Sequence, residues 1–167
     1  MKILPFALSI MIVLPGCGRL TRVPESERSV RQVFTVRLTQ DEVYERALEW
    51  CAKKLVSIND AVVVKNRERG RIIARGTGKY SEYFDFLVDR EFSYTMTIEI
   101  KEGRYRVTFD NLIVYYDERQ LKSSPAAYQF EIAKMRKHLD KLMEDLRDYI
   151  ARGTAEKKED KKQEEEW

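Results

Sequence analysis

The residue types that most often carry catalysis or bind metals are sparse in this chain. It contains a single histidine, His138, and two cysteines, Cys17 and Cys51. It has no Gly-x-Ser-x-Gly, His-Glu-x-x-His or Cys-x-x-Cys segment, so the common signatures of hydrolases, metalloproteases and thiol redox enzymes are missing. We therefore predict a protein that is not an enzyme and that uses neither a cofactor nor a metal.

The individual residues that could do chemistry each have a plainer interpretation. His138 flanks an apolar helical stripe, where a lone histidine is more often a boundary residue than a catalyst. Cys51 falls on another apolar stripe, which predicts a buried small hydrophobic side chain rather than a reactive thiol. An enzyme stays open as an alternative, and it would need acidic or hydroxyl groups that converge in a cleft near Asp85 or Asp110.

The amino terminus carries a clearer pattern. Lys2 is followed by an apolar run from Ile3 to Leu14. About twelve helical residues at about 1.5 Å each span about 18 Å, which is short of the hydrocarbon core of about 30 Å. The run therefore predicts a secretory signal rather than a membrane-spanning helix.

The segment Leu14-Pro15-Gly16-Cys17 resembles the lipobox of bacterial lipoproteins, although Pro15 stands where Ala or Ser is usual. The resemblance implies that residues 1–16 are a lipoprotein signal peptide, that cleavage precedes Cys17, and that Cys17 is lipidated and acylated. Such an anchor holds a protein stably at a membrane. Gly18 favours the outer membrane, with the domain facing the periplasm. The alternative is a plain secretory signal that leaves Cys17 as an ordinary thiol.

Composition indicates one globular domain. Apolar residues make up 43% of the 167 residues and charged residues 35%. The 31 basic residues nearly balance the 28 acidic ones, and a nucleic-acid interface normally needs a net basic face, so we expect no nucleic-acid partner. Along the chain we predict a lipidated Cys and flexible tether at 17–32, a folded domain at 33–152 and a charged disordered tail at 153–167.

The first half of the domain alternates strand and helix patterns. Apolar and polar residues alternate at 32–38, which predicts a strand. Thr39 and Glu42 form a capping box that opens an amphipathic helix. A β-branched strand at 61–65 then pairs with 71–78 as a hairpin.

The second half predicts another hairpin and a long helix. Residues 92–101 and 104–109 alternate strictly, and the change of parity that follows predicts a β-bulge near Asp110 and Asn111. Ser124 as N-cap, with Pro125 in the first turn, predicts the start of a helix that ends at Gly153.

One apolar stripe runs along this helix: Tyr128, Ile132, Met135, Leu139, Leu142, Leu146 and Tyr149. A stripe of this kind covers a sheet or pairs with another helix in a coiled coil, and we favour the sheet because its alternating strands need a cover. The predicted fold is therefore α+β with the order βαββββα, a curved antiparallel sheet carrying two helices on one face.

The spacing of these elements resembles a known family. The residues that carry the resemblance are Phe34-Thr35-Val36, the helix from Thr39 to Trp50, the strand Ile72-Ile73-Ala74-Arg75-Gly76, and the segment from Tyr94 to Asn111. Together they look like a bacterial envelope domain of unknown function whose fold is described as TBP-like, over about residues 30–150. The resemblance implies a fold and no activity, and the TBP-like label does not imply DNA binding.

The segment between the two hairpins, residues 79–90, is unusually aromatic for a connection. It carries the large apolar side chains Tyr80, Tyr83, Phe84, Phe86 and Leu87. We favour a long crossover whose aromatic rings pack on the core. The alternative is a recognition loop that contacts a protein or a lipid, because aromatic clusters on loops often serve recognition.

Two functions fit these features. The first is a membrane-anchored, non-catalytic binding or assembly module of the cell envelope, held through Cys17 and meeting an envelope protein or lipid. The second is a carrier of a small apolar ligand or lipid. A carrier needs a cavity between the sheet and the last helix, near Phe92, Met96, Leu139 and Leu142.

Overall fold

The computed structural model describes residues 21–55, 62–83, 87–117 and 119–164. Its elements are β1 (Val30–Thr35), α1 (Gln40–Lys54), β2 (Val62–Asn66), β3 (Arg71–Tyr83), β4 (Leu87–Lys101), β5 (Arg104–Tyr115), β6 (Ser123–Pro125) and α2 (Gln129–Glu164), with a short 3₁₀ turn at Glu25–Glu27. The predicted signal peptide and Cys17 lie outside the described residues. Within them, no helix has both the length and the apolar character needed to cross a bilayer.

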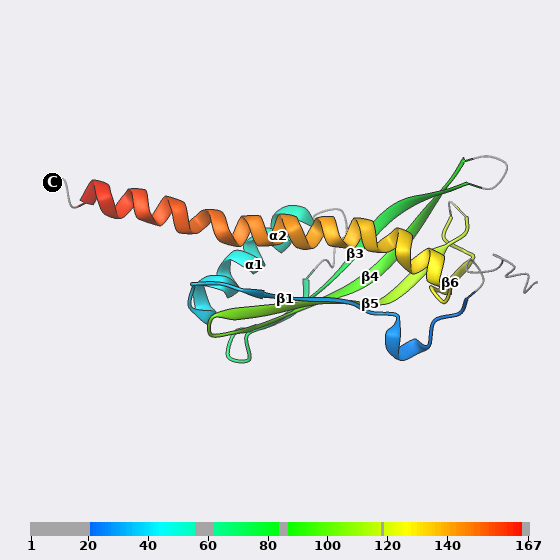
Figure 1. The fold of residues 1–167 in the computed structure, drawn as a ribbon, viewed down its shortest axis with the longest axis horizontal. Helices are drawn as coiled ribbons and strands as arrows, with labels where there is room; N and C mark the ends of the chain where they lie inside the picture. The colour runs from blue at the N-terminus through cyan, green and yellow to red at the C-terminus, as the bar shows by residue number, and fades with distance from the viewer. Residues whose placement is uncertain (1–20, 56–61, 84–86, 118, 165–167) are drawn as a thin grey trace, which may run out of the picture.

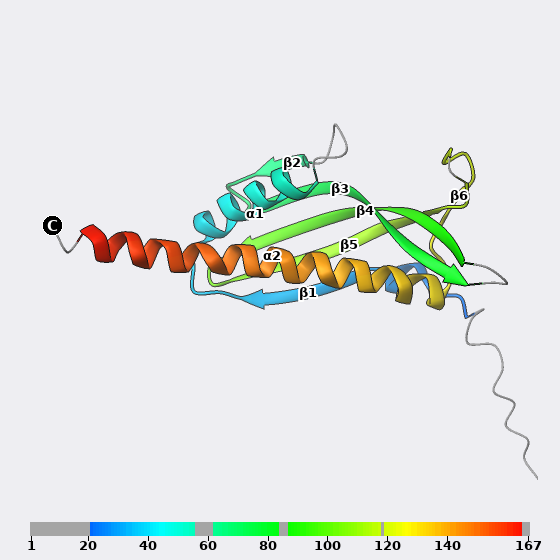
Figure 2. The ribbon, with the colours of Figure 1, turned by 90° about the horizontal axis from the view of Figure 1, so that it is seen from above.

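All strands belong to one six-stranded antiparallel sheet with the order β1-β5-β4-β3-β2, and β6 pairs with β5 off this path. Figure 1 sees the sheet nearly edge-on, with α1 and α2 together on one side, and Figure 2 looks down on α2 where it crosses the strands. The predicted α+β fold, with two helices on one face of a curved antiparallel sheet, is confirmed. The order differs from the prediction by the additional short strand β6.

The strands and α1 form for the reasons that the sequence indicated. Thr39 accepts a hydrogen bond from the Glu42 backbone, and the Glu42 side chain accepts one from the Thr39 backbone, so the predicted capping box is present. In β5, Asn111 has a φ of 50°, and the register with β4 shifts beside it, which confirms the predicted bulge. The inward residues of β3, β4 and β5 are buried on the side of the sheet that carries the helices (Figure 1).

Helix α2 covers the sheet with its apolar stripe, as predicted. Its buried apolar side chains are Ile132, Met135, Leu139, Met143, Leu146 and Ile150. Leu142 and Tyr149 lie at the margin of this core, and Tyr128 is exposed. A hydrogen bond of 2.8 Å from Trp50 Nε1 to Asp145 Oδ2 ties α1 to α2.

Both ends of α2 differ from the prediction. Ser124 and Pro125 lie in β6 beside β5, and the helix begins at Gln129. The helical backbone also continues past Gly153 to Glu164, so the prediction that the helix ends at Gly153 is wrong. A single glycine costs only about 1 kcal/mol in a helix.

The segment 79–90 is no crossover. Lys79 to Tyr83 continue β3, and Leu87 to Arg90 begin β4, so the two strands form one long hairpin. Figures 1 and 2 show this hairpin projecting beyond the body of the sheet, past the start of α2. The predicted crossover is therefore wrong, because Lys79 to Tyr83 pair directly with Leu87 to Glu91.

The predicted flexible tether at 17–32 needs a similar correction from Thr21 onward. Backbone hydrogen bonds join Val23 N to Ala127 O at 2.8 Å and Gln129 N to Thr21 O at 2.9 Å. Val30 is already buried in β1. The amino-terminal segment is thus part of the folded domain, because its backbone groups bind those at the start of α2.

Candidate functional site

The far end of the β3–β4 hairpin exposes an apolar pair. Tyr83 and Leu87 lie directly opposite each other in the strand register, and they are 65% and 67% exposed. Two large apolar side chains so exposed, side by side on two strands, are typical of a contact surface rather than of a core. Of the other residues in the predicted recognition loop, Phe84 and Phe86 lie outside the described residues.

Tyr80, the remaining member of the predicted loop, has a different role. It is buried, and its ring lies 6.1 Å from that of Phe92. Lys134 on α2 lies over the same ring at 5.9 Å and donates a hydrogen bond of 3.2 Å to the Ser81 carbonyl. Tyr80 therefore fixes the base of the hairpin to the helix, as a packed aromatic residue does. Among the members of the predicted loop that the structure describes, Tyr83 and Leu87 are the exposed ones.

A polar cluster lies beneath the hairpin, where β3, β4 and β5 meet the start of α2. Arg90 donates a hydrogen bond of 3.1 Å to the Tyr116 carbonyl, and its guanidinium lies 5.2 Å from the Tyr116 ring. Its Nε is buried without a hydrogen-bond partner, 3.9 Å from Oε2 of the buried Glu82. This loose ion pair offsets only part of the cost of removing both charges from water.

Glu131 completes the cluster from the helix side. It is 4% exposed, and its Oε2 accepts hydrogen bonds of 3.2 Å from the backbone N–H groups of Ala127 and Tyr128. Its Oε1 accepts one of 3.2 Å from the Tyr116 hydroxyl, which also lies 3.0 Å from Ser124 Oγ. The carboxylate therefore satisfies donors at the start of α2 and joins them to β5.

The tyrosines of the cluster are held in their neutral form. Burial, followed by the nearby carboxylates of Glu131 and Glu82, raises the pKa of Tyr80. Burial also raises the pKa of Tyr116, and the hydrogen bond with Ser124 partly opposes the shift. Tyr116 bonds Ser124 and Glu131, and the ring of Tyr80 contacts Lys134. The cluster therefore holds the base of the hairpin against α2.

The residues singled out for chemistry lie apart from one another. Cys51 is fully buried, as predicted, and desolvation raises the pKa of its thiol to about 12. His138 packs edge-on against Phe92 at 5.6 Å, where burial and then Lys141 lower its pKa. Desolvation raises the pKa of Asp110, against the effect of Arg71, while Asp85 lies outside the described residues. Across the described part of the chain, no three His, Cys, Asp or Glu residues gather as metal ligands would.

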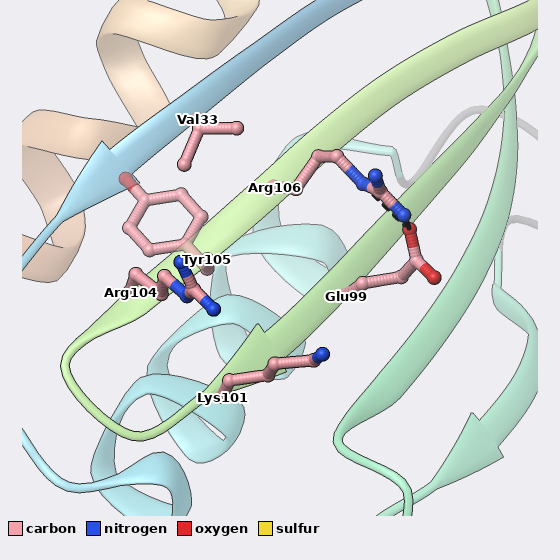
Figure 3. A pocket seen from close by; sticks show the side chains of 6 residues that line it. All are labelled: Val33, Glu99, Lys101, Arg104, Tyr105 and Arg106. Carbon is pink, nitrogen blue, oxygen red and sulfur yellow. Dashed lines mark hydrogen bonds and ion pairs between the residues drawn. The ribbon is translucent and has the colours of Figure 1, made fainter.

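A shallow basic depression of about 260 Å³ lies at the turn of the β4–β5 hairpin. Figure 3 shows Lys101, Arg104 and Arg106 around it, with Val33 at its edge. Arg106 Nε donates a hydrogen bond of 2.8 Å to Glu99, which neutralises part of this charge. The turn is at the end of the sheet away from the tip of the β3–β4 hairpin (Figure 1), so the two ends of the sheet differ in chemistry.

The interface between the sheet and α2 is closely packed where a carrier would need space. Phe92, Met96 and Leu139 are all buried with at most 1% exposure. A β-carbon added to Gly78 would lie 2.6 Å from Cζ of Phe92 and 2.8 Å from the ring of His138. At this point the interface has no room for even one methyl group.

The polar cluster is the feature that sequence reasoning missed. Glu82, Arg90 and Glu131 are charged residues at inward positions, and patterns of apolar residues do not reveal such positions. The one available signal was the alternation of Tyr80 and Glu82 with Lys79, Ser81 and Tyr83, which continues the strand pattern of β3.

Comparisons with known proteins agree with this architecture. The sequence profile of a family described as "Domain of unknown function (DUF4468) with TBP-like fold" matches residues 31–115, about half of the chain. No curated protein matches the sequence. The crystal structure of a DUF4468 family protein from Bacteroides ovatus ATCC 8483 is similar, with a TM-score of 0.58 at 17% identity over 77% of this chain and 88% of that one. A TBP-like protein from Parabacteroides distasonis ATCC 8503 has a TM-score of 0.60 at 14% identity, over 74% and 92%.

Proposed function

The chain belongs to the DUF4468 family of domains with a TBP-like fold, and we propose that it is a membrane-anchored, non-catalytic binding or assembly module of the bacterial cell envelope. In this proposal, residues 1–16 are a signal peptide and Cys17 carries the lipid. The domain then faces the periplasm, most simply from the outer membrane, and meets an envelope protein or lipid there.

The observation that carries the proposal is the exposed pair of Tyr83 and Leu87 on a hairpin whose base is rigidly held. A binding surface gains affinity when its contact residues are fixed before the partner arrives, because less conformational freedom is then lost on binding. Tyr80 and the polar cluster around Glu131 supply this fixation. The Glu131 carboxylate and the Tyr116 hydroxyl bind each other and their neighbours, and this favours a structural role for the cluster over a catalytic one.

The alternative of a small-ligand carrier receives less support. It needs a cavity between Phe92, Met96, Leu139 and Leu142. The first three of these side chains are buried, and at Gly78, beside Phe92, there is no room for one added methyl group. A carrier would have to open the core to admit a ligand, at the cost of the packing contacts around Gly78.

Metabolic labelling tests the anchoring. Cells that make the full precursor should incorporate labelled palmitate into the protein, and Cys17→Ala should abolish both the label and the shift in size caused by processing. Cys51→Ala is the matched control, because it removes the other thiol and should leave the label unchanged. Palmitate that persists in the Cys17→Ala variant would contradict the proposal.

A further inference from the structure

The amino-terminal segment fixes where an anchor at Cys17 would hold the domain. Thr21 and Val23 bind the backbone on either side of Tyr128, and the Arg28 side chain donates a hydrogen bond of 2.9 Å back to the Val23 carbonyl. The described chain therefore starts at a fixed point beside the first turn of α2. A free tether would begin only before Thr21.

The reach of that tether is short. Thr21 follows Cys17 by four positions. Four residues in a fully extended chain span at most about 14 Å. A lipid on Cys17 would therefore keep this end of the domain within about 14 Å of the membrane surface, which is comparable to twice the thickness of one headgroup layer.

The exposed apolar side chains lie at the same end of the molecule as this start point. Figures 1 and 2 both place the blue segment that begins the described chain, the β3–β4 tip and the loop between β5 and β6 at one end, while α2 runs away from it. Tyr83 and Leu87 belong to the tip. Leu121, which is 78% exposed, belongs to the loop between β5 and β6.

We propose that the tip of the β3–β4 hairpin, through Tyr83 and Leu87, lies in the interface of the same bilayer that holds the lipid of Cys17. This inference rests on the proposed anchoring, and it identifies the first partner of the hairpin as phospholipid rather than protein. An aromatic and an aliphatic side chain on a narrow projection suit the boundary between headgroups and acyl chains. Two attachment points, one covalent and one apolar, then set the orientation of the domain.

The charges near the end of the hairpin indicate which lipid headgroups this contact can accept. Lys79 and Arg90 lie beside Asp89 and Glu91, and Asp89 accepts a hydrogen bond of 2.7 Å from Ser81. Because both signs are present, the contact does not depend on an anionic membrane. In this orientation α2 points away from the bilayer, and its 36 residues extend about 54 Å into the aqueous space.

Photocrosslinking from the tip tests the proposal. Benzoylphenylalanine replaces Leu87 in the full precursor, cells are irradiated, and adducts on the purified protein are identified by mass spectrometry. The same group at Lys101, an exposed site next to the turn of the β4–β5 hairpin, is the matched control. Since Leu87 is largely exposed, its replacement leaves the core intact. We expect phospholipid adducts at position 87 several-fold above those at position 101.

The outcomes separate this inference from the proposed function. If the protein incorporates palmitate but position 87 yields no more phospholipid adduct than position 101, the tip does not lie in the bilayer, and the anchoring stands. Predominant adducts to one protein would overturn the inference in the same way, in favour of a protein partner. If the wild type takes up no palmitate, the anchoring itself fails, and the orientation derived from it fails with it.

Discussion

The hydroxyl of Tyr116, one residue beyond β5, donates a hydrogen bond of 3.2 Å to the carboxylate of Glu131 in the first turn of α2. The same carboxylate accepts backbone hydrogen bonds from Ala127 and Tyr128. The buried side chain of Glu131 thus joins the residue that follows β5 to the backbone at the start of α2, beside the base of the β3–β4 hairpin. Its contribution to stability should be unusually large for a residue so close to a helix terminus.

Replacing Glu131 should therefore destabilise the fold. Glu131→Ala removes the acceptor of three hydrogen bonds at once, and since one hydrogen bond to a charged group contributes about 1.5–3 kcal/mol and Ser124 and water can replace part of the loss, we expect the free energy of unfolding to fall by about 2–4 kcal/mol. Tyr116→Phe removes the hydroxyl that bonds Glu131 and Ser124 but leaves the backbone bonds of Glu131, and it should cost about 1 kcal/mol. Urea unfolding measures both. A loss for Glu131→Ala no larger than for Tyr116→Phe would contradict the shared role.

The packing between the sheet and α2 makes Gly78 sensitive to size. In Gly78→Ala the new methyl group meets Phe92 and His138 at 2.6–2.8 Å, so one side chain must leave its position. We expect a loss of about 1–3 kcal/mol in the free energy of unfolding. Thr77→Ala, on the opposite side of the strand, should change it by no more than about 0.5 kcal/mol. If Gly78→Ala leaves the free energy of unfolding unchanged, there is space beside Gly78, and the carrier function gains support.

Cys51 should be inert in the folded protein. Burial raises the pKa of its thiol to about 12 from an ordinary value of 9.0, so almost no thiolate forms near neutral pH. In the Cys17→Ala variant, Cys51 is the single thiol. The rate of its alkylation at pH 8 should be set by the rate of unfolding and should not increase with the concentration of the reagent. Rapid labelling under native conditions would show that the side chain is accessible. Above pH 9 the unfolded chain loses this proton first, so stability should decline as the pH rises toward 12.

His138 should make stability depend on pH in the opposite sense. Burial and Lys141 lower its pKa below the ordinary 6.5, so the unfolded chain binds this proton more readily than the folded one. Above pH 6.5 the imidazole is neutral in both states, so its titration does not change the free energy of unfolding. As the pH falls below 6.5, the unfolded chain takes up the proton first, and the free energy of unfolding decreases. Since this is the single histidine, proton NMR follows its titration directly, and a midpoint at or above 6.5 would contradict the burial. His138→Gln should reduce the loss of stability between pH 7.5 and pH 5.

The sequence predicted those parts of the fold that local patterns determine. Thr39 and Glu42 satisfy each other within one turn, and the bulge at Asn111 follows from a change of parity inside one strand. The exposure of Tyr83 and Leu87 agrees with the alternative interpretation of a recognition loop, which rested on apolar residues where a polar connection is usual. In each case the decisive contacts join residues close together in the chain.

The parts that the sequence did not predict depend on distant partners. Ser124 and Pro125 carry a strong helix-start pattern, yet they pair with β5 in the fold, because Glu131 supplies the cap further along. Glu82 and Arg90 face inward as charged residues, so the pattern of apolar inward residues stops before the end of the hairpin. A local sequence pattern cannot show that a charged side chain at an inward position will find an opposite charge on another strand.

The attachment of the amino-terminal segment yields the last prediction. Gln129 is the first residue of α2, so its N–H has no acceptor within the helix and depends on the Thr21 carbonyl, at 2.9 Å. Val23→Pro removes the neighbouring N–H that binds Ala127, and it should release the segment. Hydrogen exchange at Gln129 should then accelerate, whereas Val23→Ala keeps the N–H and should preserve most of the protection. Equal exchange at Gln129 in the proline variant and the wild type would mean that the segment is not held there, and a freed segment would lengthen the reach of an anchor at Cys17.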